Sequence, residues 1–226
     1  MLHMRWEDLL FLHWPIDPGR VRSFLPERLE LDTFDGHAWL GVVPFTMAGT
    51  RFRCMPPVPT ANRFPEINLR TYVRCGDRAG VWFFSLDAHS RLAVEGARIG
   101  FGLPYFVAEM CSRREGGRVV YRSRRADRRG PPAVFDGSWR AAGRWRPAEP
   151  ATLEHFLVER YSLFSVRRGR LLRGDVDHPP WQLAAAEVDL QTCEMARLLG
   201  LSLDGAPVSA LATQPIQVRA ASPRPV

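Results

Sequence analysis

Four polar side chains fall on one face of a predicted strand, FPEINLRTYVRC at residues 64–75. Strand alternation places Glu66, Asn68, Arg70 and Tyr72 on this face and mainly apolar residues on the other. Residues two apart on a strand are about 6–7 Å apart, so the carboxyl, amide, guanidinium and phenol would occupy different depths. Pointed into a closed sheet, this face would form a graded polar pocket. Pointed outward, it would be an ordinary wetted surface, and the strand alone leaves both alternatives open.

A second candidate carboxylate, Asp87, ends the strand VWFFSLD at residues 81–87. A carboxylate beside three consecutive aromatic residues is expected either to pair with an arginine or to have a raised pKa. The alternative is that Asp87 only begins the turn before Ser90.

A glycine-punctuated segment, ARIGFGLPYF at residues 97–106, ends on Tyr105 and Phe106. A phenol can donate a hydrogen bond to a carbonyl group. With its pKa lowered by Arg98 or Arg70, it can also act as a general acid or base. Tyr105 is therefore the third candidate for chemistry.

The histidines match no known catalytic template. The sequence contains no HExxH, no G-x-S-x-G, and neither GxGxxG nor GxxxxGK[ST]. His13 in LHWP and His178 in DHPPW each lie near a tryptophan and a proline. This setting is typical of packed structural histidines, which makes a position in a site the less favoured alternative for both.

The cysteines indicate no metal centre and no disulfide framework. They are scattered along the chain and form no CxxC pair, and we interpret them as small buried hydrophobic residues. The four are Cys54, Cys75, Cys111 and Cys193. No metal and no cofactor are predicted.

Length and composition predict one globular domain. The chain has 226 residues, of which 46% are hydrophobic and 24% charged, ordinary values for a folded core. No apolar run approaches the roughly 18–20 residues of a membrane span. The N-terminus carries acidic residues before a short apolar run and no small-residue cleavage site, so we expect a cytoplasmic protein without a membrane partner.

The net charge of +7 comes entirely from arginine, because all 31 basic residues are arginines and the chain contains no lysine. Eight arginines lie in residues 112–130, where Tyr121 is the single aromatic residue and EGG indicates a hairpin turn. A nucleic-acid site would interleave several aromatic residues for stacking. We interpret the segment as a solvated hairpin and predict no nucleic-acid partner.

Eighteen glycines and nineteen prolines favour many short strands over long helices. The clearest later helix is predicted at 151–160 with Thr152 as its N-cap, and further helical segments at 17–26, at 91–98 with Ser90 as a candidate N-cap, and at 192–201. Further strands are predicted at 104–112, 117–124 and 133–140, with Gly116-Gly117 and Asp136-Gly137 as turns.

About ten short strands at this spacing predict a mostly β (α+β) fold, a closed or partly closed antiparallel barrel with two or three peripheral helices. Residues 1–221 are expected to form one domain, and residues 222–226 a frayed tail.

Seven stretches spread over almost the whole chain carry a family resemblance: FLHWPIDP, LELDTFDGHAWLGVVPF, PEINLRTYVR, GVWFFSLDA, GARIGFGLPYF, FLVERYSLF and HPPW. In these stretches the chain resembles the YqjF-like family of uncharacterised bacterial proteins. This family is similar to a branch of the acetoacetate decarboxylase-like superfamily. The resemblance implies a cone-shaped antiparallel β-barrel around a small-molecule cavity, and it favours an inward position for Glu66 and Arg70.

The resemblance also implies that the decarboxylase chemistry is missing. Decarboxylases of that superfamily carry a segment like G-R-E-x-x-G-aromatic-P-K-K, whose first lysine forms a Schiff base while the second lowers its pKa. Aligned on the proline, the matching residues are Arg98, Gly102 and Pro104. Ile99 replaces the glutamate, and Tyr105 and Phe106 stand where the lysine pair belongs. A tyrosine cannot form an imine, so Schiff-base decarboxylation is excluded.

The leading hypothesis is a binding protein for a small carboxylate or carbonyl compound. Arg70 or Arg98 would hold an anion by its guanidinium fork, Tyr105 would polarise a carbonyl, and Glu66 would move a proton. Asp87 and Asn68 complete the predicted pocket.

Two alternatives stay open. One is an enzyme of lyase, isomerase or hydrolase type that uses non-covalent acid/base chemistry at Tyr105 and Glu66. The other is a structural or interaction protein whose interior is filled by Trp39, Trp82 and Phe84. Homo-oligomer formation is also left open.

Overall fold

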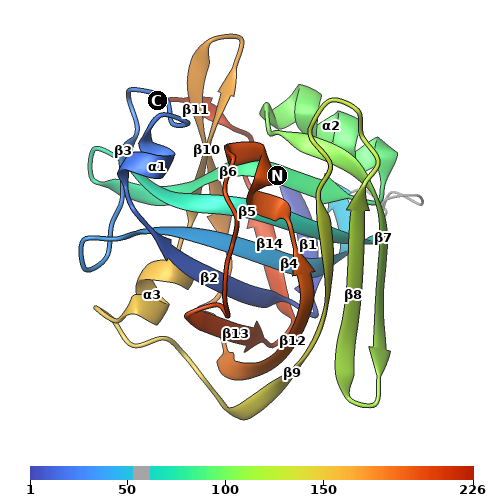
Figure 1. Cartoon of the computed structure of the whole chain (residues 1–226). Coiled ribbons are helices and arrows are strands. Elements are labelled where there is room, and N and C mark those ends of the chain that lie inside the picture. Colours follow the sequence, from blue (N-terminus) through green and yellow to red (C-terminus); the bar gives the residue numbers. More distant parts are fainter. Residues whose placement is uncertain (53–61) are drawn as a thin grey trace.

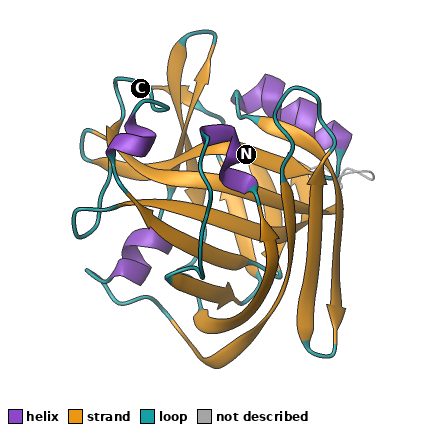
Figure 2. Cartoon of the chain, in the orientation of Figure 1, coloured by secondary structure: helices purple, strands orange, loops and turns teal. Residues whose placement is uncertain are grey.

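A computed structural model describes residues 1–52 and 62–226 of the chain. Strands form the body of the described part, and its helices lie outside them (Figures 1 and 2). The helices are α1 (Gly19–Arg22), α2 (Arg91–Phe101) and α3 (Leu153–Val158), with a 3₁₀ helix at Met195–Leu199. The first eight strands are β1 (Leu2–Glu7), β2 (Leu10–Ile16), β3 (Glu30–Leu31), β4 (Ala38–Phe52), β5 (Arg63–Cys75), β6 (Arg78–Ala88), β7 (Tyr105–Glu115) and β8 (Arg118–Arg125). The remaining strands are β9 (Val134–Arg146), β10 (Ser162–Arg167), β11 (Arg170–Asp177), β12 (Leu183–Cys193), β13 (Ser209–Thr213), β14 (Ile216–Ala220) and β15 (Arg224–Pro225).

The strands belong to one sheet that closes on itself twice. Its order is β1-β14-β11-β10-β6-β7-β8-β9-β12-β13-β2-β4-β5-β3, and two further pairings join β1 to β4 and β5 to β6. These pairings define a first ring (β4, β5, β6, β10, β11, β14, β1) and a second ring (β4, β5, β6, β7, β8, β9, β12, β13, β2). Strands β4 to β6 are shared by both rings. Within the described residues, β6 pairs in parallel with β7 and β10, and the other pairings are antiparallel.

Successive side chains of a strand point to opposite faces. Alternate residues of the shared strands therefore face the first ring, and the residues between them face the second ring. On β5, Ile67, Leu69 and Val73 belong to an apolar cluster drawn mainly from the second ring. Phe64 and Tyr72 belong to a second cluster, drawn mainly from the first ring. Both faces of β5 are therefore buried, and the predicted polar face lies inside the molecule.

Two helices begin at their predicted caps, but α2 extends three residues beyond the predicted end and α3 is shorter than predicted. Ser90 caps α2, since its hydroxyl oxygen accepts a hydrogen bond from the Ala93 N–H at 3.3 Å, and Gly102 ends it at φ 66°. Thr152 caps α3 in the same way, at 3.3 Å from the His155 N–H. The helix predicted at 192–201 was too long, because β12 continues to Cys193 through its pairing with β9.

Two local predictions differ from the structure. Asp136-Gly137 is not a turn but lies within β9, where Asp136 pairs with β8 on one side and β12 on the other. This strand is held on both edges, which overrides the local turn preference. The expected frayed tail contains β15, which pairs with β11, and the Arg224 guanidinium contacts the Asp175 carboxylate at 2.7 Å. The Gly116-Gly117 turn is confirmed, with φ of 53° and 79°.

Among the described cysteines, Cys75 and Cys193 are half-buried and free. Cys111 is exposed, so the interpretation of the cysteines as buried hydrophobic residues is wrong there. Cys54 lies outside the described residues. None of the helices in the described part is long and apolar enough to cross a membrane.

Candidate functional site

The first ring encloses a cavity of about 430 Å³. Each of its seven strands contributes to the walls, and α2 covers one end with residues such as Ala93, Gly96 and Phe101. Most wall residues are apolar, among them Met4, Phe11, Phe45, Met47, Phe64 and Phe83. The volume lies within the roughly 300–1,000 Å³ of typical ligand pockets. None of Trp39, Trp82 and Phe84, the side chains considered as fillers, lines this cavity.

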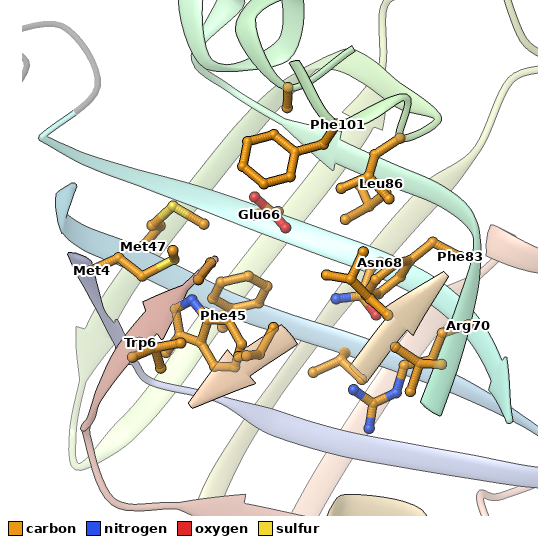
Figure 3. A pocket seen from close by; sticks show the side chains of 18 of the residues that line it. Met4, Trp6, Phe45, Met47, Glu66, Asn68, Arg70, Phe83, Leu86 and Phe101 are labelled. Carbon is orange, nitrogen blue, oxygen red and sulfur yellow. The ribbon is translucent and has the colours of Figure 1, made fainter. Parts of the chain in front are cut away.

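Glu66, Asn68 and Arg70 of β5 line the cavity in a row (Figure 3). Alternate positions of an extended strand share a face, so the sequence pattern itself creates this row. Tyr72, the fourth predicted member, is fully buried but outside the cavity wall, where its hydroxyl is 2.7 Å from His13 Nε2.

Tyr105 joins this row from another strand. It is the first residue of β7 and pairs with Leu86 of β6, after the left-handed Gly102 has turned the chain out of α2. Its hydroxyl donates a hydrogen bond to Glu66 Oε2 at 3.1 Å, and both side chains are buried. Arg98 fixes this position by donating from Nη1 to the Tyr105 carbonyl oxygen at 2.7 Å.

Burial controls the protonation of this pair. It raises the pKa of Glu66 to about 8, while the Tyr105 hydrogen bond lowers it and the charge of Asp87 raises it further. Burial, followed by the nearby Glu66, raises the pKa of Tyr105 well above its ordinary value, so the expected lowering of this pKa by Arg98 or Arg70 is wrong. At neutral pH the cavity therefore contains a neutral carboxyl group and a neutral phenol, which can donate and accept hydrogen bonds.

Arg70 lies four residues along β5 from Glu66, at another part of the cavity. Its Nη2 donates to the Leu157 carbonyl oxygen at 3.1 Å and to the Tyr72 hydroxyl at 3.3 Å. Its guanidinium carbon lies 5.0 Å from the centre of the Phe11 ring. Within residues 1–52 and 62–226, no carboxylate lies at ion-pair distance from Arg70, and its Nε has no hydrogen-bond partner. The buried Asn68 side-chain oxygen between the two ends also has no partner there.

Asp87 and Arg98 are not brought into the cavity. Asp87 is fully buried and forms a bidentate ion pair with Arg125, with contacts of 2.7 Å and 3.0 Å. Both predicted alternatives hold for its side chain: it pairs with an arginine, and burial raises its pKa although the Arg125 hydrogen bonds lower it. Arg98 acts on the Tyr105 backbone and does not line the cavity.

Sequence reasoning missed Arg125 because it belongs to the arginine-rich segment interpreted as solvated. The alternation of Tyr121, Ser123 and Arg125 on the buried face of β8 was the available signal. Arg160 was also missed. It lines the cavity, and it is neutralised by Asp32, with Nη1 at 2.6 Å from Oδ2.

The two histidines differ in their position relative to the cavity. His13 is buried outside the cavity wall, in the packed setting that the sequence indicated. His178 lines the cavity, against the favoured interpretation, and donates from Nδ1 to the Pro179 carbonyl oxygen at 2.7 Å. Burial lowers the pKa of both imidazoles, so neither supplies a positive charge at neutral pH. Among the described residues, no group of three potential ligands is arranged to hold a metal ion.

The fold places this chain with acetoacetate decarboxylase-like proteins. It is similar to an acetoacetate decarboxylase-like enzyme from Sphingomonas wittichii RW1, with a TM-score of 0.67 and 14% identity over 100% of this chain and 92% of the other. It is also similar to the enduracididine biosynthesis enzyme MppR complexed with pyruvate, with a TM-score of 0.64 and 14% identity over 99% and 89% of the two chains. Acetoacetate decarboxylase from Legionella pneumophila gives a TM-score of 0.65 at 12% identity, over 99% and 86%. At such low identity these similarities establish the fold alone.

Sequence comparison establishes the family. The model of the DUF2071 family, described as an uncharacterized conserved protein, matches residues 3–217. The chain is also 40% identical over 203 residues to the uncharacterized protein YqjF of Bacillus subtilis (strain 168), which covers 90% of this chain and 83% of YqjF. The protein therefore belongs to the DUF2071 family and is YqjF-like.

Proposed function

We propose that this protein binds a small organic carboxylate or carbonyl compound non-covalently in the cavity of the first ring. The observation that carries the proposal is Arg70, a guanidinium in a mainly apolar cavity with no acidic partner in the described part of the chain. An unpaired charge in apolar surroundings is costly, and a ligand carboxylate would remove that cost by a two-pronged hydrogen bond. Glu66, which keeps its proton at neutral pH and accepts the Tyr105 hydrogen bond, would donate to an oxygen atom at the other end of a ligand that carries one.

The chemistry of the proposed site is distinct from Schiff-base decarboxylation. The positions that the superfamily resemblance assigns to two lysines carry Tyr105 and Phe106, and the sequence contains no lysine. The Tyr105 hydroxyl is engaged with Glu66, and the Phe106 ring is engaged with Arg125, whose guanidinium carbon lies 4.2 Å from the ring centre. Structures of the similar enzyme MppR contain pyruvate or a condensation product of pyruvate. They support a carboxylate or carbonyl ligand as a class.

A second candidate function is acid/base catalysis of a lyase, isomerase or hydrolase reaction. It is favoured by the 3.1 Å hydrogen bond between Tyr105 and Glu66 inside a cavity that can admit a ligand. The pKa of Glu66, raised to about 8 by burial, is close to the pH at which a general acid or base works best.

The proposed partner is a small molecule, with no nucleic acid, and the proposed location is the cytoplasm. Arginines of the β7–β8 hairpin already have acidic neighbours, as Arg122 has in Asp136 and Arg124 in Glu109. These pairs reduce the charge available to a phosphate backbone. We expect no appreciable binding to DNA or RNA at physiological salt, measured by fluorescence anisotropy with labelled oligonucleotides.

Binding can be tested by native mass spectrometry for a co-purifying ligand and by thermal shift with a panel of carboxylates and carbonyl compounds. Wild-type protein should be stabilised by members of the panel, and Arg70→Ala should lose most of this effect. Arg78→Ala, an exposed arginine on β6, is the matched control and should behave like wild type. Equal retention of the same ligand by wild type, Arg70→Ala and Tyr105→Phe would show that the site is elsewhere.

Catalysis can be tested in D₂O by NMR, as exchange of the protons α to the ketone of 7-oxooctanoate, whose carboxylate and ketone are far enough apart to approach Arg70 and Glu66 together. Wild-type protein should accelerate the exchange if Glu66 moves a proton, and Glu66→Gln should abolish it while leaving binding intact. Binding without any proton exchange would support the non-catalytic binding function and contradict the catalytic one.

A further inference from the structure

The spacing of the polar groups in the cavity restricts the shape of its ligand. Glu66 and Arg70 are four residues apart on one face of β5, which places their Cα atoms about 13 Å apart in an extended strand. The pairing of β5 with β4 is continuous from Arg70 to Arg63, so no bulge in that ladder shortens this distance. A short acid held by Arg70 would leave the Glu66 end of the cavity without a ligand atom.

The walls between the two ends are apolar. Figure 3 shows Phe45, Met47, Met4 and Trp6 around the cavity beside the row of β5 residues. Phe101 of α2 lies at the Glu66 end. Apart from Asn68, whose side-chain oxygen has no partner among the described residues, such walls stabilise a hydrocarbon chain or ring and give a polar ligand body few hydrogen-bond partners.

The charges of the cavity wall favour a ligand with a single anionic group, placed at the Arg70 end. Arg160, the other guanidinium in the wall, is neutralised by Asp32, and Glu66 is bonded to the Tyr105 phenol. Arg70 is thus the cation without an acidic partner among the described wall residues.

We propose that the ligand is an elongated, mainly apolar monocarboxylic acid, bound with its carboxylate on Arg70 and its hydrocarbon chain running along β5 towards Glu66 and α2. This inference rests on the proposed binding function and specifies its ligand class. Burial of one methylene group contributes enough free energy to tighten binding about fourfold, so affinity rises with chain length until the cavity is filled.

The experiment is a calorimetric titration of the full chain with acetate, butyrate, hexanoate, octanoate and decanoate. Tryptophan fluorescence provides a second readout, since Trp6 and Trp181 line the cavity. We expect affinity to rise about fourfold for each added methylene group up to hexanoate or octanoate. Octanol, which has the chain without the carboxylate, should bind at least tenfold more weakly than octanoate.

Two pairs of variants test the orientation. Arg70→Ala should weaken octanoate binding at least tenfold, while Arg78→Ala should not change it. Gly96→Leu places a side chain into open space at the α2 end of the cavity and should weaken octanoate while leaving butyrate unchanged. Gly100→Leu, on the same helix but outside the cavity wall, is its control. The Gly96 pair keeps the test decisive if Arg70→Ala does not fold.

Failure of this inference is distinguishable from failure of the proposed function. If short acids bind as tightly as octanoate, the elongated ligand class is overturned and the binding function stands. If none of the acids binds, the elongated ligand class is overturned, and the binding function is overturned with it when the panel of carboxylates and carbonyl compounds also gives no thermal shift. Length-dependent binding that is insensitive to both Arg70→Ala and Gly96→Leu would overturn the proposed orientation.

Discussion

The two rings share strands β4 to β6, yet one is packed and the other contains a cavity. In the second ring, Leu69 of β5 belongs to a cluster that contains the large buried side chains Tyr121, Phe135 and Trp139. In the first ring, the opposite face of the same strand presents Glu66 and its polar neighbours to a cavity of about 430 Å³.

The same contrast separates two buried carboxylates on neighbouring strands. Asp87 points away from the cavity and is matched by Arg125, and both side chains are completely buried. Glu66 points into the cavity, and among the described residues its carboxyl group has only the phenol of Tyr105 as a hydrogen-bond partner. Burial therefore raises its pKa to about 8, and it keeps its proton at neutral pH. In the packed region, the Asp87 carboxylate is neutralised by Arg125 of the same chain. In the cavity, Glu66 keeps a proton that can be exchanged with a ligand.

The largest expected effect is the loss of the buried ion pair. Arg125→Ala leaves the Asp87 charge buried without its partner, and we expect the free energy of unfolding to fall by about 3–5 kcal/mol. Urea denaturation measures this. Arg124→Ala, the exposed neighbour on β8, is the control and should change stability little, because surface ion pairs contribute little. Similar losses for the two variants would contradict a structural role for the Asp87–Arg125 pair.

Packing should differ between the two rings when the same side chain is shortened. Leu69→Ala in the packed interior should lower the free energy of unfolding by about 2–5 kcal/mol, because it opens a new void. Leu86→Ala in the cavity wall enlarges an existing space and should cost at least about 1 kcal/mol less. Denaturation of both variants gives the comparison directly. A larger loss for Leu86→Ala would mean that the cavity wall, not the second ring, is the tightly packed region.

Glu66 should make stability depend on pH in a defined direction. Its pKa is about 8 in the folded protein and 4.5 ordinarily, so between these values the folded state binds more protons than the unfolded state. The contribution of Glu66 to the free energy of unfolding is fully present below pH 4.5 and is lost as the pH rises through about 8. The slope is at most about 1.4 kcal/mol per pH unit.

Denaturation at several pH values should show this slope in wild type and its loss in Glu66→Gln, which keeps an oxygen that can accept from Tyr105. Identical pH profiles for the two proteins would mean that Glu66 is ionised and solvated.

The smallest effect is expected for Tyr105→Phe. Removing one neutral hydrogen bond should lower the free energy of unfolding by about 1 kcal/mol. Because the Tyr105 hydrogen bond lowers the pKa of Glu66, its removal should move the pH-dependent loss of stability to higher pH. A shift to lower pH would show that Tyr105 does not stabilise the ionised form of Glu66.

Local chemistry made much of the fold predictable. Alternation over residues 64–75 identified β5 and the common face of Glu66, Asn68 and Arg70, since side-chain direction in a strand depends only on position. Hydroxyl caps at Ser90 and Thr152 identified the starts of α2 and α3 for the same local reason. Pairing on both edges of β9 is a long-range effect, and it overrode the turn preference of Asp136-Gly137.

The sequence by itself therefore determined which side chains share a face, where α2 and α3 begin and that no lysine is available. Only the tertiary structure decided that Tyr105 meets Glu66, that Asp87 meets Arg125 instead of the cavity, and that His178 lines the wall. These contacts join residues far apart in the chain. They depend on how the sheet closes into two rings, a property of strand pairing that no local pattern contains.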